Sequence, residues 1–391
     1  MSRLYYTDAY LTTFDAVVAE RLQWGDRPAV VLDRTAFYPT SGGQPFDTGE
    51  IAAVRVVEVV DADDGRVVHV VERAIDANTA VECRIDWARR FDHMQQHTGQ
   101  HVLSAAFERV HGIRTESFHL GADTCTIDVS ASVAPEAVIA VEREANRVVW
   151  TDRPVHVRFV EEAEAARLPL RKPPARGGPL RVIEIEEVDL SACGGTHVAR
   201  TGEIGLIALT NTERYKGGTR IEFVCGGRAL SRVQQLREGL AAAARQLGCA
   251  PLDVPAAVER LQDETKQQRH THRLQQQQLA ELHGARLRHE AVRRGDLLVV
   301  AQHAPDWDAQ GLKSLATAIS SQPHHVAVLV GGEPQTVVVA RGPDANVDAA
   351  AVVRALTSRF GGRGGGRPEL AQAGGLTASP ADILSTAVES L

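Results

Sequence analysis

The sequence contains few aromatic residues, only two methionines and no long apolar run. Phe, Trp and Tyr together make up 5% of its 391 residues. No apolar stretch approaches the ~20 residues that a membrane-spanning helix needs, and the first residues lack the apolar segment of a signal peptide. We therefore expect no contact with a membrane and a cytoplasmic location.

Cysteine is scarce and scattered. The chain has five cysteines, an odd number, which does not indicate a disulfide framework and fits a reducing compartment. A basic excess is also absent. The net charge of -7 argues against a non-specific nucleic-acid binder, although it leaves room for a local basic groove.

What is present indicates a globular chain of two or three domains. Hydrophobic residues make up 43% and charged residues 24%, as in ordinary folded proteins. Residues 1–85 contain short apolar or alternating runs separated by Asp and Gly turns. These predicted strands cover residues 16–20, 28–32, 51–60 and 67–71. An antiparallel barrel or sandwich is the simplest way to assemble them.

A long amphipathic helix is predicted to follow this β-rich region. Asp86 can cap its start, apolar residues recur at steps of three or four, and Gly112 offers a natural stop. His97 and His101 lie on this stripe. Residues four apart on a helix stack above one another, so both imidazoles can reach one metal ion. Two satisfied core histidines are the alternative.

A second pair of metal-binding side chains favours the metal. Cys193 and His197 are separated by two glycines and a threonine, and glycine lets the backbone turn tightly enough for both side chains to reach one ion. Together with His97 and His101 they form a nitrogen and sulfur set suited to tetrahedral zinc. We predict that residues 86–227 form an α+β zinc-binding domain.

One irregular segment of that domain is basic. Residues 168–179 contain prolines, glycines and several cations, among them Arg171 and Lys172. Such loops are often solvated connections, but cations outside helices and strands also suit a phosphate.

The remaining sequence predicts two further parts. Residues 228–294 read as a helical hairpin, partly coiled coil, and residues 295–391 as a β/α domain. Between the last two predicted helices, residues 361–368 form a Gly-rich loop. Its members Arg363, Gly365, Gly366 and Arg367 offer backbone N–H groups and positive charge to phosphate or RNA. A linker is the alternative.

Four motifs, in their order and spacing, resemble one family. They are FYPTSGGQP at 37–45, HTGQH at 97–101, RKPP at 171–174 and CGGTH at 193–197. The chain resembles the AlaX proteins, free-standing relatives of the alanyl-tRNA synthetase editing domain. The tail GGGRPELAQAGG at 364–375 resembles the synthetase's C-terminal domain, as in the long form of the family.

The resemblance implies a hydrolase that acts on mischarged alanine tRNA. Its expected reaction is hydrolysis of the ester in Ser-tRNA(Ala), and in some members Gly-tRNA(Ala). Because the β-rich region begins at once, we expect no aminoacylation domain. The hairpin and C-terminal domain are expected to dimerise the protein, to bind tRNA, or both.

The resemblance also places the loop at 37–45 at the acyl pocket. We expect Thr40 and Gln44 to select the acyl group beside His97 and His101. A site that hydrogen-bonds the serine hydroxyl has a polar group without a partner when alanine binds instead, and this disfavours alanine. Ser41 is at a position where the family often has glycine. The preference between seryl and glycyl substrates is therefore left open.

The role of zinc is open at this point as well. Zinc either assists hydrolysis directly or, with four protein ligands, only orders the pocket. A non-catalytic zinc-stapled tRNA-binding module and a deacylase of another aminoacyl-tRNA are the alternative functions.

Overall fold

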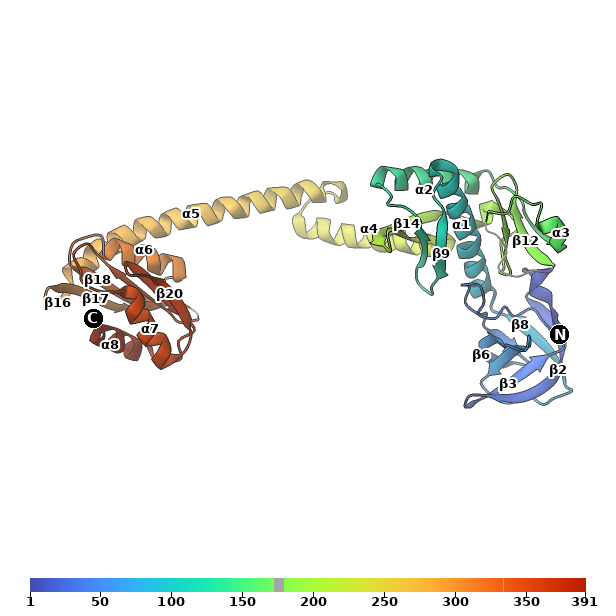
Figure 1. Ribbon diagram of the computed structural model, residues 1–391, viewed down its shortest axis with the longest axis horizontal. Helices are drawn as coiled ribbons and strands as arrows, with labels where there is room; N and C mark the ends of the chain where they lie inside the picture. The colour runs from blue at the N-terminus through green and yellow to red at the C-terminus, as the bar shows by residue number, and fades with distance from the viewer. Residues whose placement is uncertain (172–178, 333) are drawn as a thin grey trace. The chain divides into compact units, whose positions relative to one another are not determined.

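The computed structural model describes residues 1–171, 179–332 and 334–391 (Figure 1). The chain divides into two compact units, Met1–Leu240 and Ala241–Leu391. Lys172 lies outside the described residues. Within the described part of the chain, no helix is long and apolar enough to cross a membrane.

The N-terminal part of the first unit is a closed six-stranded barrel with the order β2-β3-β7-β6-β5-β8. Its strands are β2 (Thr13–Trp24), β3 (Arg27–Leu32), β5 (Gly49–Ile51), β6 (Val54–Asp61), β7 (Val67–Val71) and β8 (Ala80–Ile85). Short segments β1 (Ser2–Arg3), η1 (Leu4–Tyr6) and β4 (Arg34–Thr35) accompany it. Alternate residues point inward, as β8 shows with buried Val81, Cys83 and Ile85.

The barrel alternative is therefore confirmed, but the single strand predicted at 51–60 is divided, because β5 ends at Ile51 and β6 begins at Val54. Ala52 and Ala53 adopt left-handed backbone angles, with φ of 50° and 56°, and turn the chain between β5 and β6. Two alanines carry no turn signal, because glycine or asparagine usually occupies such positions.

Helix α1 (Trp87–His111) runs from the barrel into the second part of this unit. The Asp86 carboxylate accepts a hydrogen bond from the Arg89 amide, and Gly112 ends the helix with φ 66°. Both predicted caps are confirmed. One face of α1 packs on the antiparallel sheet β14-β15-β10-β9 through buried residues such as Leu103, Phe107 and Phe223. A Cβ at Gly99 would lie 2.3 Å from the sulfur of Cys225 in β15, so glycine permits this close packing.

The sheet strands are β9 (Thr115–Leu120), β10 (Cys125–Val129), β14 (Ile207–Tyr215) and β15 (Gly218–Cys225), with α2 (Pro135–Trp150) on the same side as α1. A second sheet, β11 (Val155–Val160), β12 (Leu180–Ile185) and β13 (Asp189–Ala192), carries the chain to Cys193. Short helices α3 (Glu162–Ala165) and η2 (Thr201–Ile204) flank it.

Two helices follow where the hairpin is predicted. They are α4 (Gly226–Leu247) and α5 (Val254–His289), with the short turn η3 (Pro251–Asp253) before α5. The predicted boundaries of the four domains stay predictions.

The second unit is built on a six-stranded sheet with the order β16-β17-β18-β19-β21-β20. Its strands are β16 (Val292–Arg294), β17 (Leu297–His303), β18 (His325–Gly331), β19 (Thr336–Arg341), β20 (Arg363–Arg367) and β21 (Leu370–Gly374). Helices α7 (Ala349–Phe360) and α8 (Pro380–Glu389) cover one face, and α6 (Ala309–Ile319) with the end of α5 covers the other. The predicted mixed α+β class is confirmed.

The Gly-rich segment is a strand and not the predicted loop. β20 is an edge strand that pairs antiparallel with β21, from Arg363 opposite Gly374 to Arg367 opposite Leu370. A Cβ at Gly364 would lie 2.3 Å from the carbonyl oxygen of Gln372. Glycine serves here to let two backbones approach closely. Arg363, Gly365, Gly366 and Arg367 all remain exposed on this strand.

A buried histidine makes the barrel sensitive to acid. His69 lies between the Thr35 hydroxyl, 2.8 Å from its Nε2, and the Val30 carbonyl oxygen, 3.2 Å from its Nδ1. Burial lowers the pKa of His69 from 6.5 to about 4. The unfolded chain thus binds this proton first, and stability is full above pH 6.5 and falls as the pH drops towards about 4.

We expect this histidine to contribute up to about 3 kcal/mol of acid destabilisation. NMR titration of the His69 ring should show it neutral down to about pH 4. The variant His69→Gln, which keeps a donor and an acceptor, should lose less thermal stability than the natural protein between pH 7.5 and pH 5. A ring that titrates near its ordinary pKa would contradict the assignment.

Candidate metal centre and its surroundings

Four side chains from two distant segments converge in the first unit. His97 and His101 come from α1, whereas Cys193 and His197 come from the turn after β13. Their ligand atoms all lie within 4.8 Å of one another. The Cys193 sulfur lies 3.4 Å from Nε2 of both His97 and His197. The predicted donor set therefore forms one group that could hold a metal ion.

Gly195 is required for this approach. A Cβ at that position would lie 2.1 Å from Cε1 of His97 and 2.9 Å from Oε1 of Gln44. No side chain fits there unless α1 moves away. Arg181 fixes the same turn from outside, because its guanidinium donates to the carbonyl oxygens of Cys193, at 2.7 Å, and Gly195, at 2.9 Å.

Each histidine is oriented through its Nδ1 atom. His97 Nδ1 lies 2.8 Å from Oε1 of Gln44, and His101 Nδ1 lies 2.7 Å from the carboxylate of Asp189. His197 Nδ1 lies 3.2 Å from the hydroxyl of Thr98. All three partners accept, so each ring keeps its proton on Nδ1 and presents Nε2 to the centre.

Thr98 and Gln44 can be assigned as acceptors from their other contacts. The Thr98 hydroxyl donates to the Met94 carbonyl oxygen at 2.8 Å, so its single hydrogen is already used. The Gln44 amide nitrogen donates to the Thr196 hydroxyl at 2.8 Å, which leaves its oxygen as the acceptor for His97.

The charges of the centre are tightly coupled. Burial alone would raise the pKa of the Cys193 thiol, but the imidazoles of His97 and His197 bring it well below its usual value. Burial would lower the pKa of His101, yet Asp189 and Cys193 outweigh burial and raise it to about 9. The imidazoles therefore favour the thiolate of Cys193, the form in which cysteine binds metals.

Asp189 is a buried carboxylate shared between two partners. Its second oxygen accepts from Nε of Arg171 at 2.5 Å and from the Ser191 hydroxyl at 3.1 Å. Burial would raise the pKa of Asp189, but His101 and Arg171 lower it to about 2. The sequence predicts Arg171 as a contact to a tRNA phosphate. Here it neutralises the acid behind a metal ligand, and its contact with tRNA stays a prediction.

The two loop residues predicted for selectivity occupy different places. Gln44 is buried, and its amide is bound to His97 and Thr196. Thr40 is exposed and pairs with Val60 of the barrel. Among the described residues, no hydrogen bond joins the Thr40 side chain to a metal ligand. The selectivity roles of both residues stay predictions.

Sequence reasoning missed Asp189, Thr98 and Arg181. Thr98 lies inside the predicted motif, but its role depends on His197, which is 99 positions away. Asp189 and His101 are 88 positions apart. No local pattern marks such pairs.

Three family descriptions match separate parts of the chain. "tRNA synthetases class II (A)" matches residues 5–89, "Threonyl and Alanyl tRNA synthetase second additional domain" matches 180–222, and "DHHA1 domain" matches 295–391. These matches define a class of proteins assembled from modules related to tRNA synthetases.

Relatives over the whole chain narrow the class. The chain is 30% identical over 404 aligned residues to the alanyl-tRNA editing protein AlaX-L of Pyrococcus horikoshii, covering 100% of this chain and 98% of that protein. The chain belongs to the AlaX family, in its long form.

Alanine–tRNA ligases are similar as well. The ligase of Pyrococcus abyssi is 35% identical over 388 residues, which cover 94% of this chain and 41% of the ligase. The chain thus spans about two-fifths of that relative. The C-Ala domain from Aquifex aeolicus alanyl-tRNA synthetase aligns in space with a TM-score of 0.23 and 24% identity, over 25% of this chain and 91% of that domain.

Removing the acceptor behind His101 should weaken metal binding. In Asp189→Asn the ring loses its anionic partner and Arg171 loses its counter-charge, so we expect the affinity for zinc to fall about 10-fold to 100-fold. Competition with a chromogenic chelator measures this.

Glu187→Gln is the matched control for that substitution. Glu187 is an exposed acid two positions away that pairs with Arg153 at 2.5 Å. The control should bind zinc as the natural chain does. Equal affinities in all three proteins would mean that Asp189 does not support the centre.

Proposed function

We propose that the protein is a trans-editing hydrolase that removes serine, and to some extent glycine, from mischarged alanine tRNA. The observation that carries the proposal is the convergence of the four ligands beside the Gln44 loop, in a chain of the AlaX family. The relative's printed name, an alanyl-tRNA editing protein, supports the same assignment.

The donor set fits zinc. Three imidazole nitrogens and one thiolate are ligands that zinc prefers, and acceptors at Nδ1 of all three histidines direct Nε2 to the centre. His101, whose pKa is raised to about 9, would have to lose its Nε2 proton when the ion binds. His97, His101, Cys193 and His197 would hold the ion. When bound, zinc supplies Lewis acidity towards an ester carbonyl and water.

The protein's own residues would position the ester. An aminoacyl ester is already activated, so placing the acyl group and a water beside it provides much of the rate. The buried Gln44 amide and the half-buried Phe118 ring, 5.9 Å from the His97 ring, lie beside the ligands and would shield an ester there from bulk water. No ATP-dependent step is needed in this reaction.

We also propose that the rest of the chain binds tRNA and a second copy of itself. Arg363 and Arg367 are exposed on an edge strand. Val233, Leu236 and Leu240, at helical spacing on α4, are exposed as well. A basic edge suits RNA phosphates, whereas an apolar seam suits a coiled-coil partner.

A deacylation assay tests the main proposal. Purified protein should release serine and some glycine from charged alanine tRNA and spare Ala-tRNA(Ala). Seryl-charged threonine tRNA serves as the comparison, since one matching family description names threonyl and alanyl synthetases together. No release from any alanine tRNA would refute the proposal. Release from threonine tRNA alone would make the chain another kind of deacylase.

Removing the metal separates the two roles of zinc. If the ion assists hydrolysis, a chelator should abolish turnover while far-ultraviolet circular dichroism stays unchanged. If the ion only orders the pocket, activity and local order should decline together. Re-addition of zinc should restore activity in both cases.

The variant Thr40→Val should weaken discrimination against Ala-tRNA(Ala). Loss of one hydrogen bond to the serine hydroxyl should lower the Ser/Ala ratio of kcat/KM about 10-fold. Thr13→Val, at another exposed threonine of the first unit, is the control. An unchanged ratio would remove Thr40 from the selectivity account.

A further inference from the structure

Arg181, on β12, is a half-buried cation without an acidic partner. Its Nε donates to the Tyr6 carbonyl oxygen at 3.0 Å, and its Nη1 donates to the carbonyl oxygens of Cys193 and Gly195. Among the described residues, Nη2 has no hydrogen-bond partner and no carboxylate pairs with this guanidinium. Residues 172–178 contain no acid in their sequence. Arg181 therefore keeps an uncompensated charge and one unused donor group.

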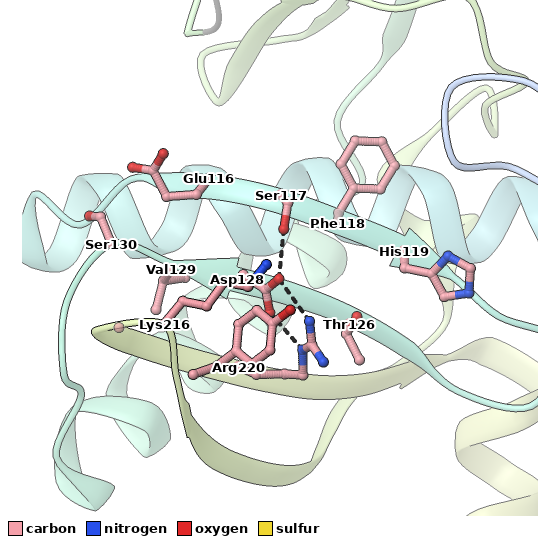
Figure 2. Close-up of a pocket in the computed structure, with 12 residues that line it drawn as sticks. Glu116, Ser117, Phe118, His119, Thr126, Asp128, Val129, Ser130, Lys216 and Arg220 are labelled. Atoms are coloured by element: carbon pink, nitrogen blue, oxygen red, sulfur yellow. Dashed lines mark hydrogen bonds and ion pairs between the residues drawn. The ribbon is translucent and has the colours of Figure 1, made fainter.

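Other arginines of the first unit that are at least partly buried have such a partner. Figure 2 shows Arg220, on the open face of the sheet β14-β15-β10-β9, joined to Asp128 by hydrogen bonds of 2.7 and 3.0 Å. Further pairs are Arg90 with Asp47, Arg171 with Asp189 and Arg228 with Asp92. A guanidinium taken from water without a counter-charge is destabilised, and burial accordingly lowers the pKa of Arg181 below its usual value. A cation kept in this state suits an anion that arrives with a ligand.

Arg181 borders the side of the metal centre that solvent reaches. The three histidine ligands are buried, whereas Cys193 is partly exposed and Gly194, the next residue, is exposed. The two carbonyl groups of this turn that accept from Nη1 belong to Cys193 and Gly195, on either side of Gly194. The cation and the exposed edge of the centre therefore lie side by side.

The ring of Tyr6 holds the guanidinium at this edge. Cζ of Arg181 lies 5.6 Å from the Tyr6 ring centroid, and a Cβ at Gly194 would lie 3.8 Å from the Tyr6 hydroxyl. Arg3 donates to the same hydroxyl at 3.4 Å, but its charge is matched by Asp61 at 2.6 Å. The positive charge at this edge that awaits a partner is therefore that of Arg181.

The chemistry of an aminoacyl ester says which anion this is. The carboxyl group of the amino acid is esterified and its amino group is cationic, so the aminoacyl group carries no negative charge. The nearest anion of the substrate is the phosphodiester on the 5′ side of the terminal ribose. An ester at the metal centre places that phosphodiester one ribose away, at the distance of a neighbouring side chain.

We propose that Arg181 binds, through Nη2, the phosphate that joins the last two nucleotides of the tRNA. This contact places the terminal ribose at the exposed edge of the metal centre. The inference rests on the proposed function, because that function supplies the ester. Guanidinium donors match phosphate oxygens in geometry and charge.

The test neutralises the phosphate and the arginine separately. Two uncharged acceptor minihelices of alanine tRNA are compared, one natural and one with a methylphosphonate in place of the last phosphodiester. Fluorescence anisotropy measures their binding to the full zinc-loaded chain, to Arg181→Gln and to Arg181→Lys. Arg220→Gln is the matched control, since Arg220 is an arginine of the same unit whose charge is already paired. Zinc content and circular dichroism verify the fold of each variant.

We expect the natural chain to bind the methylphosphonate RNA about 10-fold more weakly than the natural RNA. Arg181→Gln should bind both RNAs equally, and about 10-fold more weakly than the natural chain binds the natural RNA. Arg181→Lys keeps the charge without the planar fork, so the difference between the RNAs should shrink to about 3-fold. Arg220→Gln should keep the full difference.

A role confined to holding the ligand turn predicts another pattern. Each Arg181 variant would then distinguish the two RNAs as the natural chain does, even if its zinc content fell, and this result would overturn the proposal. A natural chain that binds both RNAs equally would overturn it without any variant. If Arg181→Gln does not fold, Arg181→Lys decides, because an undiminished difference in that variant contradicts the contact.

Hydrolysis of Ser-tRNA(Ala), measured beside binding, separates this inference from the proposed function. If the natural chain hydrolyses the ester but Arg181→Gln still distinguishes the RNAs, the function stands and the phosphate contact fails. If the natural chain hydrolyses nothing yet shows the expected phosphate dependence, the function fails and Arg181 remains a contact to an RNA end.

Discussion

The carboxamide of Gln44 connects three parts of the first unit that are far apart in sequence. Its oxygen accepts from the His97 ring and, at 3.1 Å, from the Thr196 amide, while its nitrogen donates to the Thr196 hydroxyl. A buried amide is costly unless every one of its groups is bonded, and here its oxygen and nitrogen both find partners. The loop at 37–45, helix α1 and the turn at 193–197 are therefore fixed together. The geometry of the metal centre depends on this contact.

A buried ion pair places that loop against the helix. Arg90 and Asp47 are 1% and 0% exposed and lie 2.5 Å apart. Arg90 also donates to the carbonyl oxygens of Ala36 and Ala9. Replacing such a pair by apolar residues often costs little stability, so its effect here is to specify position. Asp47 is three residues after Gln44, and Arg90 is two turns before His97. The ion pair therefore positions the two partners of the Gln44–His97 hydrogen bond relative to one another.

The sequence predicts the parts of this structure that have local signals. The helix 87–111 follows from its apolar period and from its caps at Asp86 and Gly112. The ligand set follows from donor type and spacing. Asp189 and Arg181 carry no such signal, because each acts on a segment brought near only by the folded sheet β11-β12-β13. The Gly-rich segment misleads for a related reason, since composition does not tell a flexible glycine from one that admits a neighbouring strand.

The acceptors at Nδ1 of the three histidines fix the orientation of all three imidazole rings of the centre. Each Nδ1 is bonded to a group fixed by a further contact: Gln44 by Thr196, Asp189 by Arg171, and Thr98 by the Met94 carbonyl. Cys193 differs, because it lies on a turn next to glycines and its sulfur accepts a weak bond from the Gly195 amide at 3.4 Å. The three histidines, held through Nδ1, and the Cys193 thiolate would together hold an ion.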